Sequence, residues 1–347
     1  LAMKETKVED YRIEKDSIGT RDIPGDVYYG VQSLRAAENF HITGLRMHPE
    51  IINSLAYSKK GAAITNCEVG MGEKRKAQAL VQACDEILAG KFREDFIVDP
   101  IQGGAGTSLN MNANEVIANR AIELLGGSKG DYSIINPNDD VNCSQSTNDV
   151  IPTAGKRTSL RLLKNLKHEL LQLHGALCKK AEEFNDVIKM GRTQLQDAVP
   201  IRLGQEFRAY SVAIMRDIHR MEKAMGEMRT LNLGGTAVGT GLNADEAYLH
   251  RIVPILSEVS DMDLAQAYDL IDATQNLDVF VAVSGAVKAC AVTLSKIAND
   301  LRLMSSGPRA GLAEINLPAK QNGSSIMPAR ILWPSGEPLK MIFSNSS

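Results

Sequence analysis

The sequence has few aromatic residues and few cysteines, and neither sign of charge dominates it. Only 5% of its 347 residues are aromatic, so a core must be built mainly from aliphatic side chains and methionine. The five cysteines are widely spaced and form no Cys-x-x-Cys pair. This spacing excludes a disulfide framework or a zinc ribbon and favours reduced thiols in the cytoplasm. The formal net charge of −3 provides no basic field for nucleic acid.

The marks of secretion and of metal binding are missing as well. We expect no apolar stretch to span a bilayer, and Leu1–Asp16 lacks the apolar segment of a secretory signal. No His-Glu-x-x-His or Gly-x-Ser-x-Gly motif occurs, and the six histidines are scattered. We therefore expect no metal site, no obligatory cofactor and no histidine acting as the base.

Helical periodicity is the strongest positive signal. Apolar side chains recur every three or four residues in Thr158–Phe184 and Glu206–Arg229, which predicts long helices packed side by side. Val279–Leu294 is apolar almost all round, with Lys288 its only charge. Such a helix is expected to be buried, either at the centre of a bundle or at a subunit contact.

The N-terminal part of the chain has a more mixed pattern. Helical stretches cover Pro49–Gly90, with a break near Gly70–Gly72, and Asn110–Leu125, while Val27–Val31 fits a short strand or an extended segment. Since strand signals are scarce, we expect a mainly α fold, in which a long helical bundle follows a smaller α-rich domain. The expected divisions are an N-terminal domain at residues 1–147, an incomplete bundle domain at 148–330 and a divergent tail at 331–347.

Four stretches rich in glycine and small polar residues interrupt the helices. They are Gly103–Asn112, Val141–Asp149, Gly191–Val199 and Gly323–Pro328. Hydroxyls, amides and helix N-termini bind carboxylates well, so these loops would suit a small polyanion. Taken alone, Ser146-Thr147-Asn148 also fits a helix N-cap with its turn, and the glycines of the first stretch fit a plain turn.

A fifth small-residue stretch, Leu233–Leu242 (LGGTAVGTGL), contains glycines spaced like those of a dinucleotide-binding turn. Because it follows a helix rather than a strand, that interpretation is weak.

Taken together, the loops resemble those of the aspartase/fumarase superfamily. The resemblance runs from about Tyr11 to Pro328. It is carried by five motifs in order, GGAGTSLNMNANEVIANRA, VNCSQSTNDVIPT, GRTQLQDAVPIRLGQEF, SSGPRAGLAEINLP and GSSIMP. It implies a homotetramer in which loops from three subunits combine at each active site.

Two positions favour the aspartase branch of this superfamily. Fumarases typically carry histidines where this chain has Gln194 and Asp140. The resemblance therefore implies the reversible anti-elimination of ammonia from L-aspartate to give fumarate. A fumarate hydratase, or a truncated inactive fragment of such a lyase, remains the alternative.

The resemblance also assigns roles to individual residues. Ser324 would be the base that removes the Cβ proton and leaves an aci-carboxylate intermediate. The substrate would be held by Thr107, Ser146, Thr147, Asn148, Thr193, Gln194, Ser325 and Arg330. After Arg330 the chain departs from the family pattern, since Leu332 stands where the family has an asparagine. We accordingly expect the C-terminal part of the family fold to be absent.

Overall fold

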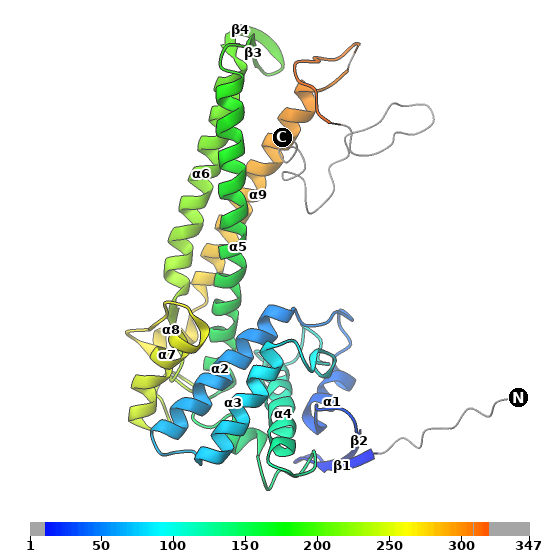
Figure 1. Cartoon of the computed structure of the whole chain (residues 1–347), viewed down its shortest axis with the longest axis vertical. Coiled ribbons are helices and arrows are strands. Elements are labelled where there is room, and N and C mark those ends of the chain that lie inside the picture. The colour runs from blue at the N-terminus through cyan, green and yellow to red at the C-terminus, as the bar shows by residue number, and fades with distance from the viewer. Residues whose placement is uncertain (1–10, 308, 319–347) are drawn as a thin grey trace, which may run out of the picture. The chain divides into compact units, whose positions relative to one another are not determined.

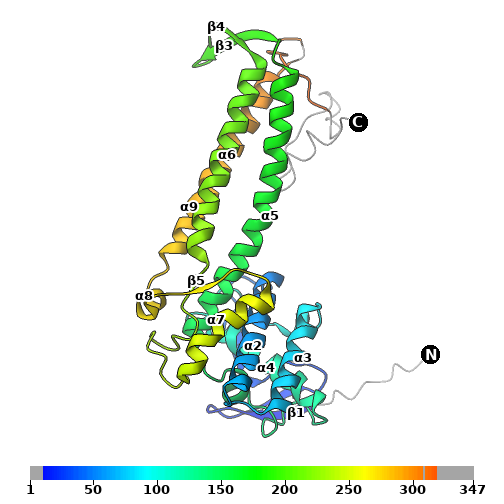
Figure 2. The same cartoon turned by 60° about the vertical axis from the view of Figure 1, so that its left-hand side comes forward.

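The computed structural model describes residues 11–307 and 309–318 (Figures 1 and 2). The chain divides into two compact units, each assembled from two stretches of sequence. The first contains the described residues up to Arg161 together with Glu227–Asp278, and the second contains Leu162–Gly226 and the described residues from Val279 onward. The divisions expected at residues 147 and 330 stay a prediction.

The first unit is a cluster of helices with small sheets at its edges. Strands β1 (Tyr11–Lys15) and β2 (Thr20–Pro24) pair antiparallel, and β5 (Thr230–Leu231) and β6 (Ala265–Gln266) pair parallel. The helices are α1 (Val31–Asn39), α2 (Pro49–Glu68), α3 (Lys74–Leu88), η1 (Arg93–Asp95), α4 (Thr107–Leu124), the π-helix η2 (Pro137–Val141), α7 (Glu246–Ser260) and α8 (Leu270–Gln275). Helix α2 packs against α3 and α7.

Buried carboxylates hold the start of α1. Glu115 on α4 accepts hydrogen bonds from the backbone N–H groups of Gly30 and Ser33, at 2.9 and 3.0 Å. Glu14 on β1 accepts from the N–H of Val31 at 2.9 Å and from the Tyr132 hydroxyl at 2.9 Å. Negative groups at a helix N-terminus satisfy its free donors and complement its dipole. This arrangement ties α1, β1 and α4 into one core.

The second unit is built on three long helices that lie side by side (Figures 1 and 2). They are α5 (Thr147–Glu183), which begins in the first unit, α6 (Leu203–Met228) and α9 (Asp278–Met304). Their shared core is aliphatic and Met-rich, with Leu170, Leu177, Ile214, Met221 and Ile297 among its buried side chains. An antiparallel hairpin of β3 (Ile188–Thr193) and β4 (Gln196–Arg202) connects α5 to α6.

The predicted mainly α fold is confirmed, including the break between α2 and α3. Helix α4 starts three residues before the predicted Asn110, and α5 starts well before the predicted Thr158. Residues 27–30 form neither strand nor helix and Val31 begins α1, so the strand alternative for Val27–Val31 is wrong and the extended segment describes its first four residues. The hairpin β3–β4 was not predicted, since its outward-facing residues show no regular alternation of polar and apolar side chains.

Helix α9 differs from expectation in its burial. It turns Ala286, Cys290 and Ile297 into the core of the second unit, but Val281 is 71% exposed and Val292 is 64% exposed. Within this chain it is therefore not buried on every side, contrary to the bundle-centre interpretation.

By length and composition, α9 also meets the criterion for a membrane-spanning helix, contrary to the expectation that no stretch would do so. One helix of this kind is weak evidence for a span, because core helices of soluble proteins pass the same test.

Candidate active site

Thr107 is the first residue of α4 and directly follows the glycine-rich turn. Gly106 before it has a φ of 91°, in the left-handed region that favours glycine. A Cβ atom at Gly106 would also approach the Ile151 side chain to 2.9 Å. The Thr107 side chain is exposed at a helix N-terminus, where free backbone N–H groups and the helix dipole attract an anion.

The segment Ser146–Asp149 forms the start of α5. The Ser146 hydroxyl accepts a hydrogen bond from the N–H of Asn148 at 3.3 Å, and the Asp149 carboxylate accepts one from the N–H of Ser146 at 2.9 Å. This reciprocal pair has the form of a capping box. The capping interpretation therefore describes Ser146, whereas Thr147 and Asn148 have other partners.

A chain of side-chain hydrogen bonds joins Thr147 to α4 and α2. The amide of Asn110, one turn along α4 from Thr107, donates to the Thr147 hydroxyl at 3.2 Å and to Asn142 Oδ1 at 3.1 Å. Lys59 on α2 donates to the same Asn142 oxygen at 2.7 Å and to Gln145 Oε1 at 3.0 Å. These bonds connect the two predicted loops of the first unit, which lie far apart in sequence.

Asp149 holds the loop that contains Gly234 and Thr236 against the start of α5. Its carboxylate is fully buried and accepts hydrogen bonds from the N–H groups of Gly234 at 3.1 Å and Thr236 at 3.0 Å. Burial raises the pKa of Asp149 to about 6, although its hydrogen bonds act in the opposite direction. Thr236 has a φ of 55° and a buried hydroxyl with no partner among the described residues. A β-branched residue in this conformation is strained, as residues at functional sites often are.

The anchored loop also holds Asn148. The Asn148 amide donates to the carbonyl of Ala237 at 2.8 Å, and Asn232 donates to the carbonyl of Asn148 at 3.0 Å. Leu233–Leu242 thus lies against the predicted substrate-binding segment, a neighbour that the sequence reasoning missed. The run of small residues in this loop is the sequence feature that points to a ligand site, although its glycine spacing by itself suggests only a dinucleotide-binding turn.

Thr193 and Gln194 lie at the tip of the β3–β4 hairpin in the second unit. Gln194 and Leu195 have φ values of 50° and 65°, as required by the tight turn that best fits a twisted hairpin. Both predicted residues are exposed. Glu314 forms ion pairs with two residues of β3, with Arg192, next to the tip, at 2.7 Å and with Lys189, near the base of the hairpin, at 2.8 Å.

The predicted site residues therefore fall into three groups. Thr107, Ser146, Thr147 and Asn148 lie in the first unit, and the last three adjoin one another. Thr193 and Gln194 lie in the second unit. The residues Ser324, Ser325 and Arg330 lie outside the described part of the chain, so the convergence of all these residues on one substrate stays a prediction.

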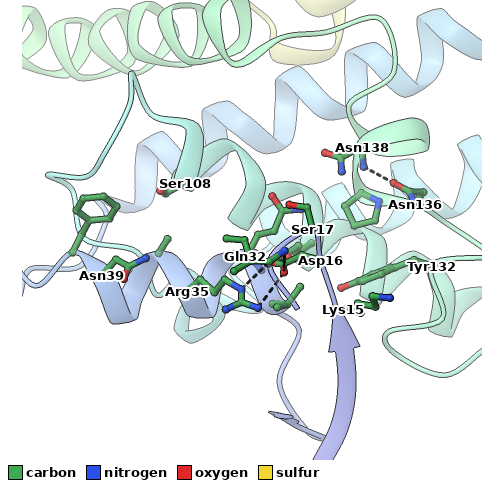
Figure 3. Close-up of a pocket in the computed structure, with 16 residues that line it drawn as sticks. Lys15, Asp16, Ser17, Gln32, Arg35, Asn39, Ser108, Tyr132, Asn136 and Asn138 are labelled. Atoms are coloured by element: carbon green, nitrogen blue, oxygen red, sulfur yellow. Dashed lines mark hydrogen bonds and ion pairs between the residues drawn. The ribbon is translucent and has the colours of Figure 1, made fainter. Parts of the chain in front are cut away.

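The first unit has a cavity of about 580 Å³ (Figure 3). It is lined by Ser108, which is next to Thr107, but by none of the predicted site residues. Two of its lining residues, Arg35 and Asp16, form an ion pair at 2.7 Å. Lys15, Gln32, Asn39, Tyr132 and Asn138 are among its other lining residues. Among residues 11–307 and 309–318, no cluster of His, Cys, Asp or Glu is placed to hold a metal ion.

Comparison with known proteins gives consistent relatives across the chain. Residues 19–331 match the lyase family model. The chain is 57% identical over 323 residues to aspartate ammonia-lyase of Bacillus subtilis, a match that covers 93% of this chain and 68% of that protein. It is 50% identical to aspartate ammonia-lyase of Escherichia coli, covering 92% of this chain and 68% of the relative.

Solved structures agree with these matches. A fumarate lyase:delta crystallin from Brucella melitensis, bound to cobalt, superposes with a TM-score of 0.90 at 51% identity, covering 93% of this chain and 70% of that one. A class II fumarase from Schistosoma mansoni superposes with a TM-score of 0.89 at 35% identity, covering 93% and 71%. Matching motifs, fold and sequence over nearly the whole length show that this chain belongs to the aspartase/fumarase superfamily of lyases.

Proposed function

We propose that this chain is an aspartate ammonia-lyase, which converts L-aspartate to fumarate and ammonia and also runs in reverse. The observation that carries the proposal is the 50–58% identity to aspartate ammonia-lyases over at least 92% of the chain. The identity to the class II fumarase is lower, at 35%. Gln194, where fumarases typically have histidine, favours the same branch.

The first unit supplies the kind of groups that a dicarboxylate requires. Thr107 and Thr147 each stand at a helix N-terminus, where backbone donors and dipole favour negative charge. In the proposed complex these hydroxyls and the Asn148 amide bind the substrate carboxylates. Ser146 contributes through its hydroxyl, which accepts the N–H of Asn148 as the cap of α5 and keeps its own hydrogen to donate to the substrate. From the hairpin, Thr193 and Gln194 reach the same substrate, with Ser325 and Arg330 completing the set.

The chemical step is removal of a weakly acidic proton next to a carboxylate. Ser324 accepts the Cβ proton, and the electron pair moves into the adjacent carboxylate to form an aci-carboxylate. This intermediate then collapses, forming the Cα–Cβ double bond while the C–N bond breaks and ammonia leaves. Donors aimed at the developing charge lower the barrier, and each is typically worth about 10²–10³ in rate. Because serine is a weak base, Ser324 needs neighbouring donors that stabilise its alkoxide.

We further propose a homotetramer with shared active sites, working in the cytoplasm. The second unit exposes apolar side chains along all three long helices, among them Leu171, Val212 and Val292. Exposed apolar surface of this extent is typical of an interface. The five cysteines are free thiols, which suits a reducing compartment.

The ultraviolet absorbance of fumarate provides the test. The purified protein is incubated separately with L-aspartate and with L-malate, and we expect fumarate to form from L-aspartate. Turnover of L-malate alone would establish the hydratase instead. For the base, we expect Ser324→Ala to lower kcat far more than it changes KM, while Ser347→Ala, in the divergent tail at residues 331–347, serves as the control. An unchanged kcat in Ser324→Ala would refute the role of Ser324.

A further inference from the structure

Lys59 is a buried cation and the one charged side chain among the buried residues of α2. Its side chain is 1% exposed, and Leu55, Ala56 and Ala62 of the same helix are buried beside it. Burying an ammonium group costs several kcal/mol unless partners compensate it. An unbranched apolar residue of similar length, such as methionine, would fill the same space without this cost. Stability of α2 alone therefore does not explain the lysine.

The partners of Lys59 lie in the segment that leads into the candidate site. Its ammonium donates to Asn142 Oδ1 at 2.7 Å and to Gln145 Oε1 at 3.0 Å. Gln145 directly precedes Ser146, and its amide is fixed in turn by the carbonyls of Val141 and Cys143, both at 3.0 Å. From α2, Lys59 thus holds the turn Asn142–Asn148 in place through hydrogen bonds.

The same bonds extend to a predicted substrate contact. Asn142 Oδ1 accepts from both Lys59 and Asn110, and Asn110 also donates to the Thr147 hydroxyl. Because Asn110 uses its two amide hydrogens on Asn142 and Thr147, the Thr147 hydroxyl is left with its own hydrogen free to donate to a ligand. The chain of bonds therefore sets both the position of Thr147 and the direction in which it donates.

The charges around Lys59 are few. Asp149 on α5 and Cys84 on α3 are the titratable groups whose charges act on it. Burial lowers the pKa of Lys59 to about 7, and Asp149 partly opposes this effect. The neutral amine still has two hydrogens, so Lys59 can donate to both Asn142 Oδ1 and Gln145 Oε1 in either protonation state.

We propose that Lys59 is a positioning residue for substrate binding, which holds the turn Asn142–Asn148 so that Thr147 and Asn148 meet a substrate carboxylate. The inference rests on the proposed lyase function, and it assigns Lys59 no contact with substrate. Its effect is exerted through Asn142, Gln145 and Asn110.

The test compares Lys59→Met with Lys60→Met. Lys60 is the next residue on α2, but it points outward and pairs with Asp85 at 2.7 Å, so its replacement controls for loss of a lysine. We expect Lys59→Met to raise KM for L-aspartate about 10- to 100-fold, as for loss of hydrogen bonds to a charged group. Its kcat should change less, and its Tm should stay the same or rise. Lys60→Met should keep the wild-type KM.

Hydrogen exchange read by mass spectrometry gives a second measurement that needs no turnover. In Lys59→Met the amides of residues 142–148 should exchange faster, while those of α3 should not change. Unchanged exchange together with an unchanged KM would overturn the proposal. A wild-type protein that does not turn over L-aspartate would refute the proposed function, and the exchange result would still decide whether Lys59 holds the turn.

Gln145→Met provides a variant that leaves Lys59 in place. It removes one of the two acceptors on a half-buried residue, and we expect a smaller rise in KM in the same direction. If Lys59→Met fails to fold, this variant decides, because a wild-type KM in Gln145→Met would count against the proposal.

Discussion

The carboxylate of Glu314 pairs with the guanidinium of Arg192 at 2.7 Å, and this contact ties the β3–β4 hairpin to the segment after α9. Glu314 also pairs with Lys189, which in turn pairs with Glu206 on α6. Burial acts to raise the pKa of Glu314, but the hydrogen bonds from Arg192 and Lys189 outweigh it and hold the pKa below its usual value. The hairpin that carries Thr193 and Gln194 is therefore fixed along β3 by a partly buried ion-pair cluster.

Replacing this carboxylate should impair catalysis. We expect Glu314→Gln to lower kcat/KM for L-aspartate about tenfold or more, because small displacements of substrate-positioning groups have large effects on rate. Asp197→Asn is the matched control, since Asp197 approaches the same Arg192 at 3.5 Å but its side chain is 72% exposed. Exposed ion pairs contribute little. Equal effects in the two variants, measured by steady-state kinetics, would contradict the role given to Glu314.

Asp149 should make stability depend on pH between about 4 and 6. Its pKa is 3.8 when unperturbed and about 6 in the folded chain, mainly because of burial. Below pH 3.8 both states are protonated, whereas between the two values the unfolded state ionises first. The free energy of unfolding should therefore fall as pH rises through this window, by about 3 kcal/mol.

The control for this prediction is Asp149→Asn, measured by urea unfolding at several pH values. The variant should be less stable at low pH, because an amide cannot accept hydrogen bonds on both of its polar atoms, and its slope between pH 4 and 6 should be shallower. Lys59 does not interfere, since its pKa of about 7 keeps it protonated over this range. A wild-type slope in Asp149→Asn would exclude Asp149 as the source.

Gly30 should tolerate no side chain. A Cβ atom there would lie 2.6 Å from a carboxylate oxygen of Glu14 and 2.6 Å from the Tyr132 hydroxyl. We expect Gly30→Ala to lower the free energy of unfolding by about 2–3 kcal/mol, as overpacking a core does. A Cβ atom at Gly175 on α5 would meet no side chain or neighbouring element within 4 Å, so Gly175→Ala should instead stabilise by up to about 1 kcal/mol. Urea unfolding of both variants provides the check, and a neutral Gly30→Ala would show that the carboxylates at α1 can move.

A charge on the exposed face of α9 should weaken assembly. Val292 is 64% exposed on this helix, and the proposed tetramer would cover it. Val292→Asp should shift the molar mass in solution below that of a tetramer, while Val292→Leu, which keeps the surface apolar, should not. Light scattering coupled to size-exclusion chromatography measures both, and a wild-type mass in Val292→Asp would place the interface elsewhere.

Local sequence was sufficient for most of the helices. The apolar period of three to four residues marked α5 and α6, because each buries one stripe in a shared core, and a run that is apolar almost all round marked α9. It also marked α2 and α3, with their break at Gly70–Gly72. The polar loops between these helices were visible as interruptions of the same pattern, and Ser146 was recognisable as a possible cap because capping depends on residues only two or three positions away.

Tertiary structure decided which of these loops meet and what holds them. The bonds from Lys59 to Asn142, and from Asp149 to Gly234, join residues more than 80 positions apart, and no local pattern encodes such partners. Nor does periodicity show that Lys59 is buried, since lysine normally marks a solvated face. The sequence by itself determined the helices and the chemical character of the loops, because both follow from short-range backbone and side-chain preferences. The network around Thr147 was decided only by packing, which brings distant polar groups into an interior where each must find a partner.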